Sequence, residues 1–481
     1  MDLHVSLNGD RRVTGQVYRQ LRDAILEGRI RPGEALPSSR ELARRLQVSR
    51  TTAVVAYDRL RAEGFLTSRV GAGTFVNTEI RSRSPAGPAS SPLKPRALWD
   101  ELPEPPDMSA SRAEYDFRPG IPDAGRFPFA SWRARVSRQL HQHTVGKGTH
   151  IGAAGHPGLR AAIAHHLGVS RAVRANAEDV LVTSGSQQAI DLIARVLLEP
   201  GDLVAVEDPG YLLPRRAFQV HGCRVVGVPV DADGLLVDAI PNRARLVYVT
   251  PSHQYPLGMA MSMERRQALL AWAHRADAAI VEDDYDSEFR YGGRPLEPLQ
   301  SLDGSGRVLY VGSFSKVLLP TLRLGFVVAP SPLRAALRKA KFATDWHTAV
   351  PTQAAAAQFL DDGLLAQHIR RMRRVYAERH ELAVRVLARD FRGLLTPLPS
   401  TGGLHLAALL DWGRGTADQA IAERAAAHGV AVLPVSSNYI TAPPRAGLLI
   451  GYGAITTDRI EAGLRRLRDI VMADDAAPRS S

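Results

Sequence analysis

From residue 114 onward, short β-rich runs alternate with segments of helical spacing, and this alternation limits the fold more than any other feature of the chain. Such alternation is typical of an α/β domain around a mostly parallel sheet, where ligands bind at the carboxyl ends of strands. Functional side chains are therefore expected directly after these runs. The β-rich runs lie at 180–183, 203–206, 246–249, 279–281 and 308–311, and the helical segments include 187–198, 262–275 and 332–342.

Composition divides the chain into three parts. Residues 1–78 contain 13 Arg against 8 Asp and Glu, a denser positive charge than in the rest of this +12 chain. Residues 79–113 are rich in Pro, Ser and Ala and hold few side chains that could build a core. Proline favours extended backbone, so this segment is predicted to be a linker. We therefore expect an N-terminal domain at 1–78 and a main domain at 114–481.

The cysteine count and the hydropathy exclude several classes of protein. The single cysteine, Cys223, cannot form an internal disulfide, and no Cys/His cluster has the spacing of a zinc site, so no metal is expected. No apolar run reaches the ~20 residues that a membrane span needs, and residues 1–10 lack the order of a signal peptide. These observations predict a cytoplasmic protein without membrane contact.

The N-terminal domain has the pattern of a helix-turn-helix followed by a hairpin. Apolar spacing predicts a first helix within 14–28, and Ser38 with Glu41 forms a capping box that starts a second one. A tight turn at 47–49 precedes a third helix, and 65–76 alternates around a Gly-containing turn as a wing would. The side chains of the third helix expected to face inward are Val54, Val55, Tyr57 and Leu60.

A helix-turn-helix of this kind places the start of its third helix in a DNA major groove. Arg50, Thr51 and Thr52 would then meet base edges and phosphates. Arg40 and Arg69 would hold the DNA backbone. The alternative is that this is an ordinary helical core, because short helices with arginines occur in many folds.

Longer motifs favour the DNA-binding interpretation. The runs at 31–43 (Arg-Pro-Gly-Glu-Ala-Leu-Pro-Ser-Ser-Arg-Glu-Leu-Ala), 49–52 (Ser-Arg-Thr-Thr) and 71–76 (Gly-Ala-Gly-Thr-Phe-Val) closely resemble the winged helix-turn-helix of the GntR family of bacterial repressors. This resemblance implies an operator in double-stranded DNA as a partner. The contact residues that it implies are Arg40, Arg50, Thr51 and Thr52, with Gly73 near the minor groove.

Polar clusters follow three of the β-rich runs in the main domain. Ser-Gly-Ser-Gln at 184–187 opens a helix, so its free N–H groups suit a phosphate, although such turns more often simply start helices. Glu-Asp-Asp-Tyr-Asp at 282–286 places carboxylates where a buried strand should be apolar, which implies a cationic partner. The third cluster, Ser-Phe-Ser-Lys at 313–316, is followed by Arg323.

Lys316 stands out because the chain has only five lysines, and this one follows an apolar run directly. Burial there would lower the pKa of its ammonium toward that of a nucleophilic amine. An exposed lysine at a strand end is the alternative. A lysine that forms a Schiff base, a carboxylate for a pyridinium N–H and a turn for a phosphate are together what pyridoxal 5'-phosphate (PLP) needs.

The main domain resembles the fold-type I aminotransferases. The resemblance lies in Gly-His-Pro-Gly-Leu-Arg at 155–160, Glu-Asp-Pro-Gly-Tyr at 207–211, Thr-Pro-Ser-His-Gln-Tyr-Pro-Leu-Gly at 250–258 and the three clusters above. Joined to a GntR-like head, it resembles the MocR group of regulators. This implies an α/β main domain of PLP-dependent transferase fold type I, with a mostly parallel sheet and a smaller C-terminal α+β subdomain.

The same resemblance assigns roles to individual residues. It makes Lys316 the Schiff-base lysine and pairs Asp283 with the ring nitrogen of PLP, with Asp284 as the second choice. Tyr285 would hydrogen-bond the phenolic oxygen, and Tyr211 would stack on the ring unless it is an ordinary core tyrosine. The residues implied to hold the phosphate are Gly185, Ser186, Ser313, Ser315 and Arg323.

The chain departs from the aminotransferase pattern at three places. Leu449 stands where an arginine usually grips the substrate carboxylate, and the 250–258 stretch lacks the Asn that makes a second contact to the phenolic oxygen. Ile151 stands where a tyrosine commonly reaches the partner subunit's phosphate. Arg215, Arg216 and Arg445 are candidates to compensate.

These observations favour a transcriptional regulator whose PLP domain senses PLP itself or an amino acid and alters operator binding. The alternatives are a working aminotransferase with an accessory DNA-binding module and a DNA-organising protein with an inactive dimerisation domain. The resemblance also implies a homodimer, with the head of one chain lying against the sensor domain of the other.

Overall fold

The computed structural model describes residues 13–69, 73–80, 94–104, 113–141, 150–292, 297–412 and 415–475. The chain forms two compact units, 1–101 and 102–481. Most of the linker predicted at 79–113 lies outside the described residues, although a short helix, α4 (Ala97–Glu101), falls within it. Among the described residues no helix is long and apolar enough to cross a membrane.

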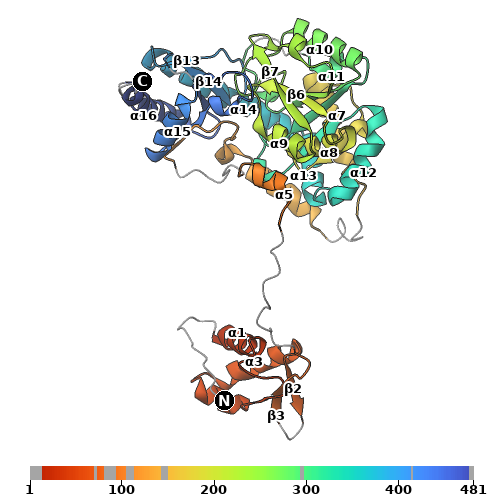
Figure 1. Cartoon of the computed structure of the whole chain (residues 1–481), viewed down its shortest axis with the longest axis vertical. Helices are drawn as coiled ribbons and strands as arrows, with labels where there is room; N and C mark the ends of the chain where they lie inside the picture. Colours follow the sequence, from red (N-terminus) through yellow and green to blue (C-terminus); the bar gives the residue numbers. More distant parts are fainter. Residues whose placement is uncertain are drawn as a thin grey trace. The chain divides into compact units, whose positions relative to one another are not determined.

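The smaller unit packs three helices against a small sheet with the strand order β1-β3-β2 (Figure 1). Its apolar core includes Val17, Leu21, Leu42 and Leu60, and it places the first turn of α3 at the surface. The elements of this unit are α1 (Val13–Leu26), β1 (Ala35–Leu36), α2 (Ser39–Arg45), α3 (Arg50–Ala62), β2 (Leu66–Arg69) and β3 (Gly73–Val76). The predicted helix-turn-helix and wing are therefore present, with the wing turn at 70–72 outside the described residues.

One detail of the third helix was predicted wrongly. Val55 is 49% exposed, and the buried positions of α3 are Ala53, Ala56, Tyr57 and Leu60. Residues 53, 56, 57 and 60 share one face of a helix with 3.6 residues per turn, whereas 55 lies about 100° from 56 and turns outward. The position of Val55 on the helix, and not its apolar character, therefore determines that its side chain faces solvent.

The larger unit is built on an eight-stranded sheet with the order β5-β12-β11-β10-β9-β6-β7-β8. Its central strands are parallel, β12 runs antiparallel between β11 and β5, and β8 pairs antiparallel with β7. The strands are β5 (Val180–Thr183), β6 (Leu203–Asp208), β7 (Arg224–Asp231), β8 (Gly234–Leu235), β9 (Ala244–Val249), β10 (Ala279–Asp284), β11 (Val308–Ser313) and β12 (Gly325–Val328). All five predicted runs are strands of this sheet.

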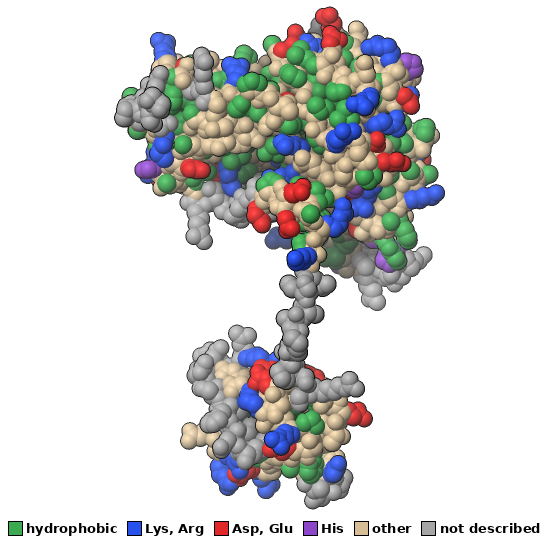
Figure 2. Space-filling view, in the orientation of Figure 1, with side chains coloured by type: hydrophobic (Ala, Val, Ile, Leu, Met, Phe, Trp, Pro, Cys, Tyr) green, Lys and Arg blue, Asp and Glu red, His purple; other side chains and the backbone are tan. Residues whose placement is uncertain are grey.

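Helices cover both faces of the sheet, as the α/β pattern predicts (Figure 1). One apolar cluster joins α8 to Val281, Leu309 and Val311, and another joins α10 to Val247 and Ile280. The helices of this layer are α7 (Pro157–Arg171), α8 (Ser186–Leu197), α9 (Leu212–Val220), α10 (Met263–Ala276), α11 (Leu299–Leu302), α12 (Arg334–Asp345) and α13 (Val350–Asp361), with α5 (Phe129–Gln139) packed on α13. Acidic and basic side chains are intermixed on the face shown in Figure 2.

A smaller subdomain follows at the carboxyl end. It pairs a four-stranded sheet of order β13-β14-β17-β16 with three helices, and a separate β15–β4 pair joins it to the start of the unit. Its elements are α14 (Leu364–Asp390), β13 (Leu395–Pro397), β14 (His405–Leu410), α15 (Ala417–Ala427), β15 (Val430–Ala431), β16 (Leu433–Pro434), β17 (Gly447–Gly451) and α16 (Thr457–Asp475), with β4 at Tyr115–Asp116. The predicted fold class is confirmed in all three of its parts.

Candidate functional site

The predicted DNA-contact residues of the smaller unit lie at its surface. Ser49 caps α3 by accepting a hydrogen bond from Thr52 N at 3.1 Å, which leaves Arg50 and Thr51 exposed on the first turn. The positive end of the helix dipole lies at the same place and attracts phosphate. Arg40 is exposed on α2, and no described acidic side chain pairs with Arg40 or Arg50.

Arg44 and Arg45 of this unit share one acidic partner. Glu41 pairs with Arg44 and Arg45 on α2 instead of closing the predicted capping box, although Ser38 does accept a hydrogen bond from Glu41 N. On the wing, Arg69 lies over the Phe75 ring at 5.1 Å from its centre. Gly73 is exposed with φ of +112°, a backbone conformation that side chains disfavour.

In the larger unit, Lys316 follows β11 and its amine points inward. Its Nζ donates a hydrogen bond to Gly120 O at 2.6 Å. Burial lowers the pKa of the Lys316 ammonium, while the nearby carboxylates of Asp286 and Asp283 raise it. The amine thus lies among groups that can accept a hydrogen bond from it or stabilise its positive charge.

Asp283 and Asp284 are neighbours in β10, and side chains alternate across a strand, so they lie on opposite faces of the sheet. Asp283 shares the α8 face with Tyr248 of β9, whose hydroxyl donates to Asp283 Oδ2 at 2.5 Å. Asp283 Oδ1 is buried and has no partner among the described residues. A buried carboxylate oxygen without a partner is costly, so this atom is suited to accept a hydrogen bond from a ligand N–H.

Asp284 is held by hydrogen bonds from other side chains of the protein. Its Oδ2 accepts hydrogen bonds from Arg171 Nε at 2.9 Å and from the Tyr310 hydroxyl at 2.6 Å. Arg171 ends α7, so this buried ion pair ties that helix to the sheet. Asp284 Oδ1 is also buried without a partner among the described residues. The face of the sheet therefore separates the two candidates for a ring nitrogen, because Asp283 lies on the α8 side and Asp284 lies on the opposite side with Arg171.

The turn after β5 forms a cradle at the start of α8. Gly185 caps the helix with φ of +87°, and Arg323 NH2 donates to Ser184 O at 2.7 Å. A Cβ placed on Gly185 would lie 2.7 Å from Arg323 NH2 and displace the guanidinium group, and the positive φ itself favours glycine here. The N–H groups of the first helical turn, beginning at Ser186, point out of this cradle, which suits a phosphate.

Two sets of hydrogen bonds lie beside this turn, one between the hydroxyls of Ser313 and Ser315 and one between Gln188 and Lys341. After β11, Ser313 Oγ donates to Ser315 Oγ at 2.9 Å and accepts from Ser315 N. Beneath the turn, Gln188 Oε1 accepts from both Ser184 N and the fully buried Lys341 Nζ, each at 2.8 Å. Lys341 is one of the few lysines of the chain, and that scarcity was a signal that sequence reasoning did not use.

Three tyrosines lie together near this cradle and Asp283. The Tyr211 ring meets the Tyr255 ring edge-on at 5.2 Å, and Tyr255 lies 6.3 Å from Tyr285 between ring centres. Burial raises the pKa of the Tyr285 hydroxyl well above its ordinary value, and the Asp286 carboxylate raises it further. Each hydroxyl therefore stays protonated near neutral pH. Tyr255 occupies the stretch in which the sequence lacks the usual Asn.

Leu449 behaves as its apolar character predicts. It lies fully buried in β17, inside an apolar cluster with Leu257, Ala407 and Val435. A side chain in such a cluster offers no hydrogen bond to a carboxylate. The main domain therefore keeps the lysine, carboxylate and phosphate-turn features but lacks an arginine at this position.

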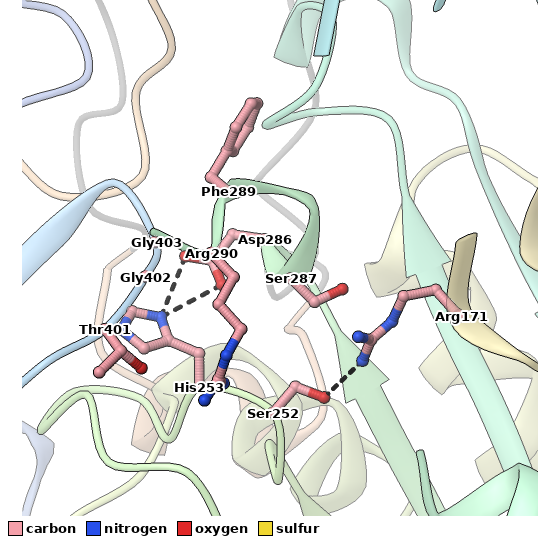
Figure 3. A pocket seen from close by; sticks show the side chains of 10 residues that line it. All are labelled: Arg171, Ser252, His253, Asp286, Ser287, Phe289, Arg290, Thr401, Gly402 and Gly403. Carbon is pink, nitrogen blue, oxygen red and sulfur yellow. Dashed lines mark hydrogen bonds and ion pairs between the residues drawn. The ribbon is translucent and has the colours of Figure 1, made fainter. Parts of the chain in front are cut away.

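Some residues of the site were not predicted from the sequence. Tyr248 and Gly120 contact Asp283 and Lys316, respectively, from segments without a motif. The buried side chains of His253, Asp286 and His405 also lie together, with their ligand atoms within 4.8 Å of one another. His253 and Asp286 line a pocket with about 330 Å³ of empty space, flanked by Arg171 and Arg290 (Figure 3). The cluster of acidic residues around 283 was the available signal for Asp286.

Comparison with protein families gives two matches that follow the two units. The model of bacterial regulatory proteins of the gntR family matches residues 13–76, and the model of aminotransferase class I and II matches residues 121–467. The second match covers more than half of the chain. Both agree with the fold of the unit in which they lie.

Relatives with both parts are known. A probable rhizopine catabolism regulatory protein, MocR, from Rhizobium meliloti is 38% identical over 95% of this chain and 93% of its own length. The pyridoxine biosynthesis transcriptional regulator PdxR of Corynebacterium glutamicum is 33% identical over 98% of this chain and 99% of its own.

A solved structure is also similar to this chain. The kynurenine aminotransferase of Pyrococcus horikoshii, solved in complex with PMP, has a TM-score of 0.70 at 29% identity and covers 77% of this chain and 96% of its own.

The buried Asp283 carboxyl gives the ligand-free protein a predictable pH dependence. Burial raises the pKa of Asp283 to about 7, whereas an aspartate in an unfolded chain titrates near ~4. Between these values the unfolded chain releases a proton that the folded protein keeps, so the free energy of unfolding falls as pH rises. We predict that ligand-free Asp283→Asn is more stable than wild type by about 1–3 kcal/mol at pH 8, and by much less at pH 5.

Urea unfolding at pH 5, 6.5 and 8 measures this difference. Asp238→Asn is the matched control, since Asp238 is exposed on the surface, and its stability should follow wild type at each pH. A constant gap between Asp283→Asn and wild type across the three pH values would show that Asp283 does not titrate in this range.

Proposed function

This chain belongs to the MocR-type transcriptional regulators, and from that premise we propose that its larger unit binds PLP and controls how its head binds an operator. The protein would act in the cytoplasm, where its DNA target is. PLP, when bound, supplies an electrophilic aldehyde that reacts with amines. The following paragraphs give what supports each part of the proposal.

The observation that supports PLP most strongly is the partnerless Asp283 Oδ1 in the same unit as an inward-pointing Lys316 amine. Asp283 would accept the ring N–H, which would also stabilise its ionised form against burial. Lys316 would hold the cofactor covalently through its amine, which would give up its hydrogen bond to Gly120 O. Tyr211 would lie on the ring face and Tyr285 would hydrogen-bond the phenolic oxygen. The phosphate would be held by Gly185, Ser186, Ser313, Ser315 and Arg323.

DNA binding rests on the head. Arg50 and Thr51 would contact base edges. Thr52 follows them on the first turn, and its N–H donates to the capping Ser49 Oγ. Arg40 and Arg69 would contact the DNA backbone, with Gly73 of the wing near the minor groove. The operator would be double-stranded DNA with paired half-sites, because a homodimer presents two heads.

A head-to-tail homodimer is the assembly we propose. Two stacked aromatic side chains of the larger unit are exposed, Phe342 by 53% and Trp346 by 45%, with ring centres 5.1 Å apart. His150 packs edge-on against the Trp346 ring at 4.2 Å. Exposed aromatic clusters are typical of surfaces that another protein covers, which supports contact with a second copy.

The alternative function is an active aminotransferase with an accessory DNA-binding module. Leu449 argues against efficient turnover, because an amino acid's carboxylate would lack its bidentate arginine in a partly desolvated site. An inactive dimerisation domain is a weaker alternative, since such a domain has no need of a buried lysine and an unpaired carboxylate. The effector is therefore a ligand to be sensed, either PLP itself or an amino acid.

We predict that the purified protein binds PLP covalently through Lys316 and shows the visible absorption of that adduct. Borohydride reduction followed by peptide mass spectrometry should find the label on Lys316, and Lys316→Ala should lose it. Lys339→Ala serves as the control, since this lysine is exposed on α12. A label that persists in Lys316→Ala would refute the assignment.

Substitution of Arg50 and of Arg40 should affect DNA binding in different ways. Arg50→Ala should cost about 1–3 kcal/mol of operator binding and reduce sequence specificity, because it removes a base contact. Arg40→Ala should weaken binding to all sequences and lower the salt dependence, because it removes a phosphate contact. Fluorescence anisotropy on operator and random DNA at several salt concentrations measures both. Equal losses on both DNAs for both variants would contradict this division.

The effector can be identified by titration. We expect PLP added to the cofactor-free protein to change operator affinity, in line with the pyridoxine biosynthesis named for the PdxR relative. Amino acids added to the loaded protein should act weakly, since Leu449 cannot hold a carboxylate. A large response to one amino acid in wild type, with none to PLP, would make the protein an amino acid sensor.

A further inference from the structure

Behind Tyr285 lies a buried acid–imidazole pair that the proposed function does not use. His253 Nδ1 lies 3.1 Å from both carboxylate oxygens of Asp286 and 2.9 Å from the Tyr285 hydroxyl. The side chains of His253 and Asp286 are only 6% and 2% exposed. Figure 3 shows the pair facing each other in the wall of the pocket. Three oxygen atoms from two side chains thus meet at a single ring nitrogen.

The carboxylate decides which ring nitrogen is protonated. An unprotonated Nδ1 would place its lone pair against two anionic oxygens, whereas an Nδ1–H donates to them. The opposite nitrogen, Nε2, lies 3.2 Å from Ser400 Oγ, whose own hydroxyl donates to Gly402 O at 3.1 Å. A neutral His253 therefore has its proton on Nδ1.

This tautomer fixes the direction of the Tyr285 hydroxyl. Facing an N–H, the Tyr285 oxygen can only accept from His253, so its own proton is directed to a different acceptor. We propose that Asp286 and His253 are positioning residues that hold the Tyr285 hydroxyl as a donor toward the phenolic oxygen of bound PLP. This inference rests on the proposed PLP site, since that oxygen belongs to the cofactor.

The surroundings keep Tyr285 able to donate. Burial, followed by Asp286, raises the pKa of Tyr285 well above its ordinary value, so the proton remains on the hydroxyl. His405 packs beside His253, and burial lowers the pKa of its imidazole to about 3, so this second ring stays neutral. The charged and titratable groups around the Tyr285–His253 pair are Asp283, Asp286, Glu207, Tyr255, His380 and His405, with Arg171 and Arg290 in the same pocket and Lys316 acting on His405.

A metal ion is the competing explanation for these side chains. His253, Asp286 and His405 are ligand types that Zn²⁺ accepts. A metal on His253 Nδ1 would replace the proton and leave the Tyr285 oxygen without this donor. In the structure, however, His253 Nδ1 is already bonded to Asp286, and His405 has Pro256 O at 3.3 Å.

The first test measures the tautomer directly in the cofactor-free protein. ¹⁵N-histidine NMR at pH 8, with the His253 signal identified by its loss in His253→Gln, should show a protonated Nδ1. Asp286→Asn should move the proton to Nε2, because the amide N–H donates to Nδ1. Asp286→Glu restores the carboxylate and should restore the wild-type tautomer. An unprotonated Nδ1 in wild type would overturn the inference, whether or not PLP binds.

The second test measures the consequence in the loaded protein. When Tyr285 ceases to donate, the phenolic oxygen of PLP becomes more basic. The proton that this oxygen shares with the Lys316 nitrogen is then lost only at higher pH. His253→Phe removes the N–H that faces Tyr285 but keeps the Asp286 carboxylate, which itself raises the pKa of Lys316. The pH midpoint of the visible band should therefore rise by about one unit in His253→Phe. Thr401→Val is the control, because Thr401 lines the same pocket without a hydrogen bond to His253. An unchanged midpoint in His253→Phe would overturn the inference.

A third measurement addresses the metal. Titration of the cofactor-free protein with Zn²⁺ alone should give no tight binding that depends on His405. Tight binding that is lost in His405→Gln would overturn the proposed role of the pair. Failure of PLP to bind at all would appear instead as a missing visible band in wild type, which contradicts the proposed function and leaves the tautomer result to decide this inference.

Discussion

The alternation of side chains along β10 separates two adjacent carboxylates, and the arrangement of the larger unit depends on that separation. Asp284 is directed to the face where Arg171 and Tyr310 neutralise it, so it fixes helix α7 to the sheet. Asp283 is directed to the face of α8 with one oxygen unpaired. Burying both on one face would place two anions together at high cost, whereas the strand geometry gives one a structural role and keeps the other available to a ligand.

The positions of the elements were largely predictable because buried parallel strands have continuous apolar sequences. All five predicted runs are strands, and the head has the expected helices and wing strands. The antiparallel direction of β12 was not predictable, since its apolar residues read the same in either direction. Val55 was placed wrongly because an apolar residue next to a buried face need not belong to it.

The site was predictable only where a motif names a residue. Lys316 and Gly185 follow strand ends and Asp283 lies near the end of β10, where the sequence pattern indicates. Tyr248 and Gly120 reach the same place from the neighbouring strand β9 and from a segment near the start of the unit. No local pattern encodes such contacts, because they depend on which distant segments pack together. The same reason hides the His253–Asp286 pair, whose members are far apart in sequence and meet only in the folded chain.

The Lys316–Gly120 hydrogen bond has a consequence for ligand binding. Gly120 lies within ten residues of the end of the segment that tethers the head to the larger unit. A ligand on the Lys316 amine would compete with the Gly120 carbonyl for that amine. One amine therefore links the proposed ligand site to the backbone near the start of the larger unit.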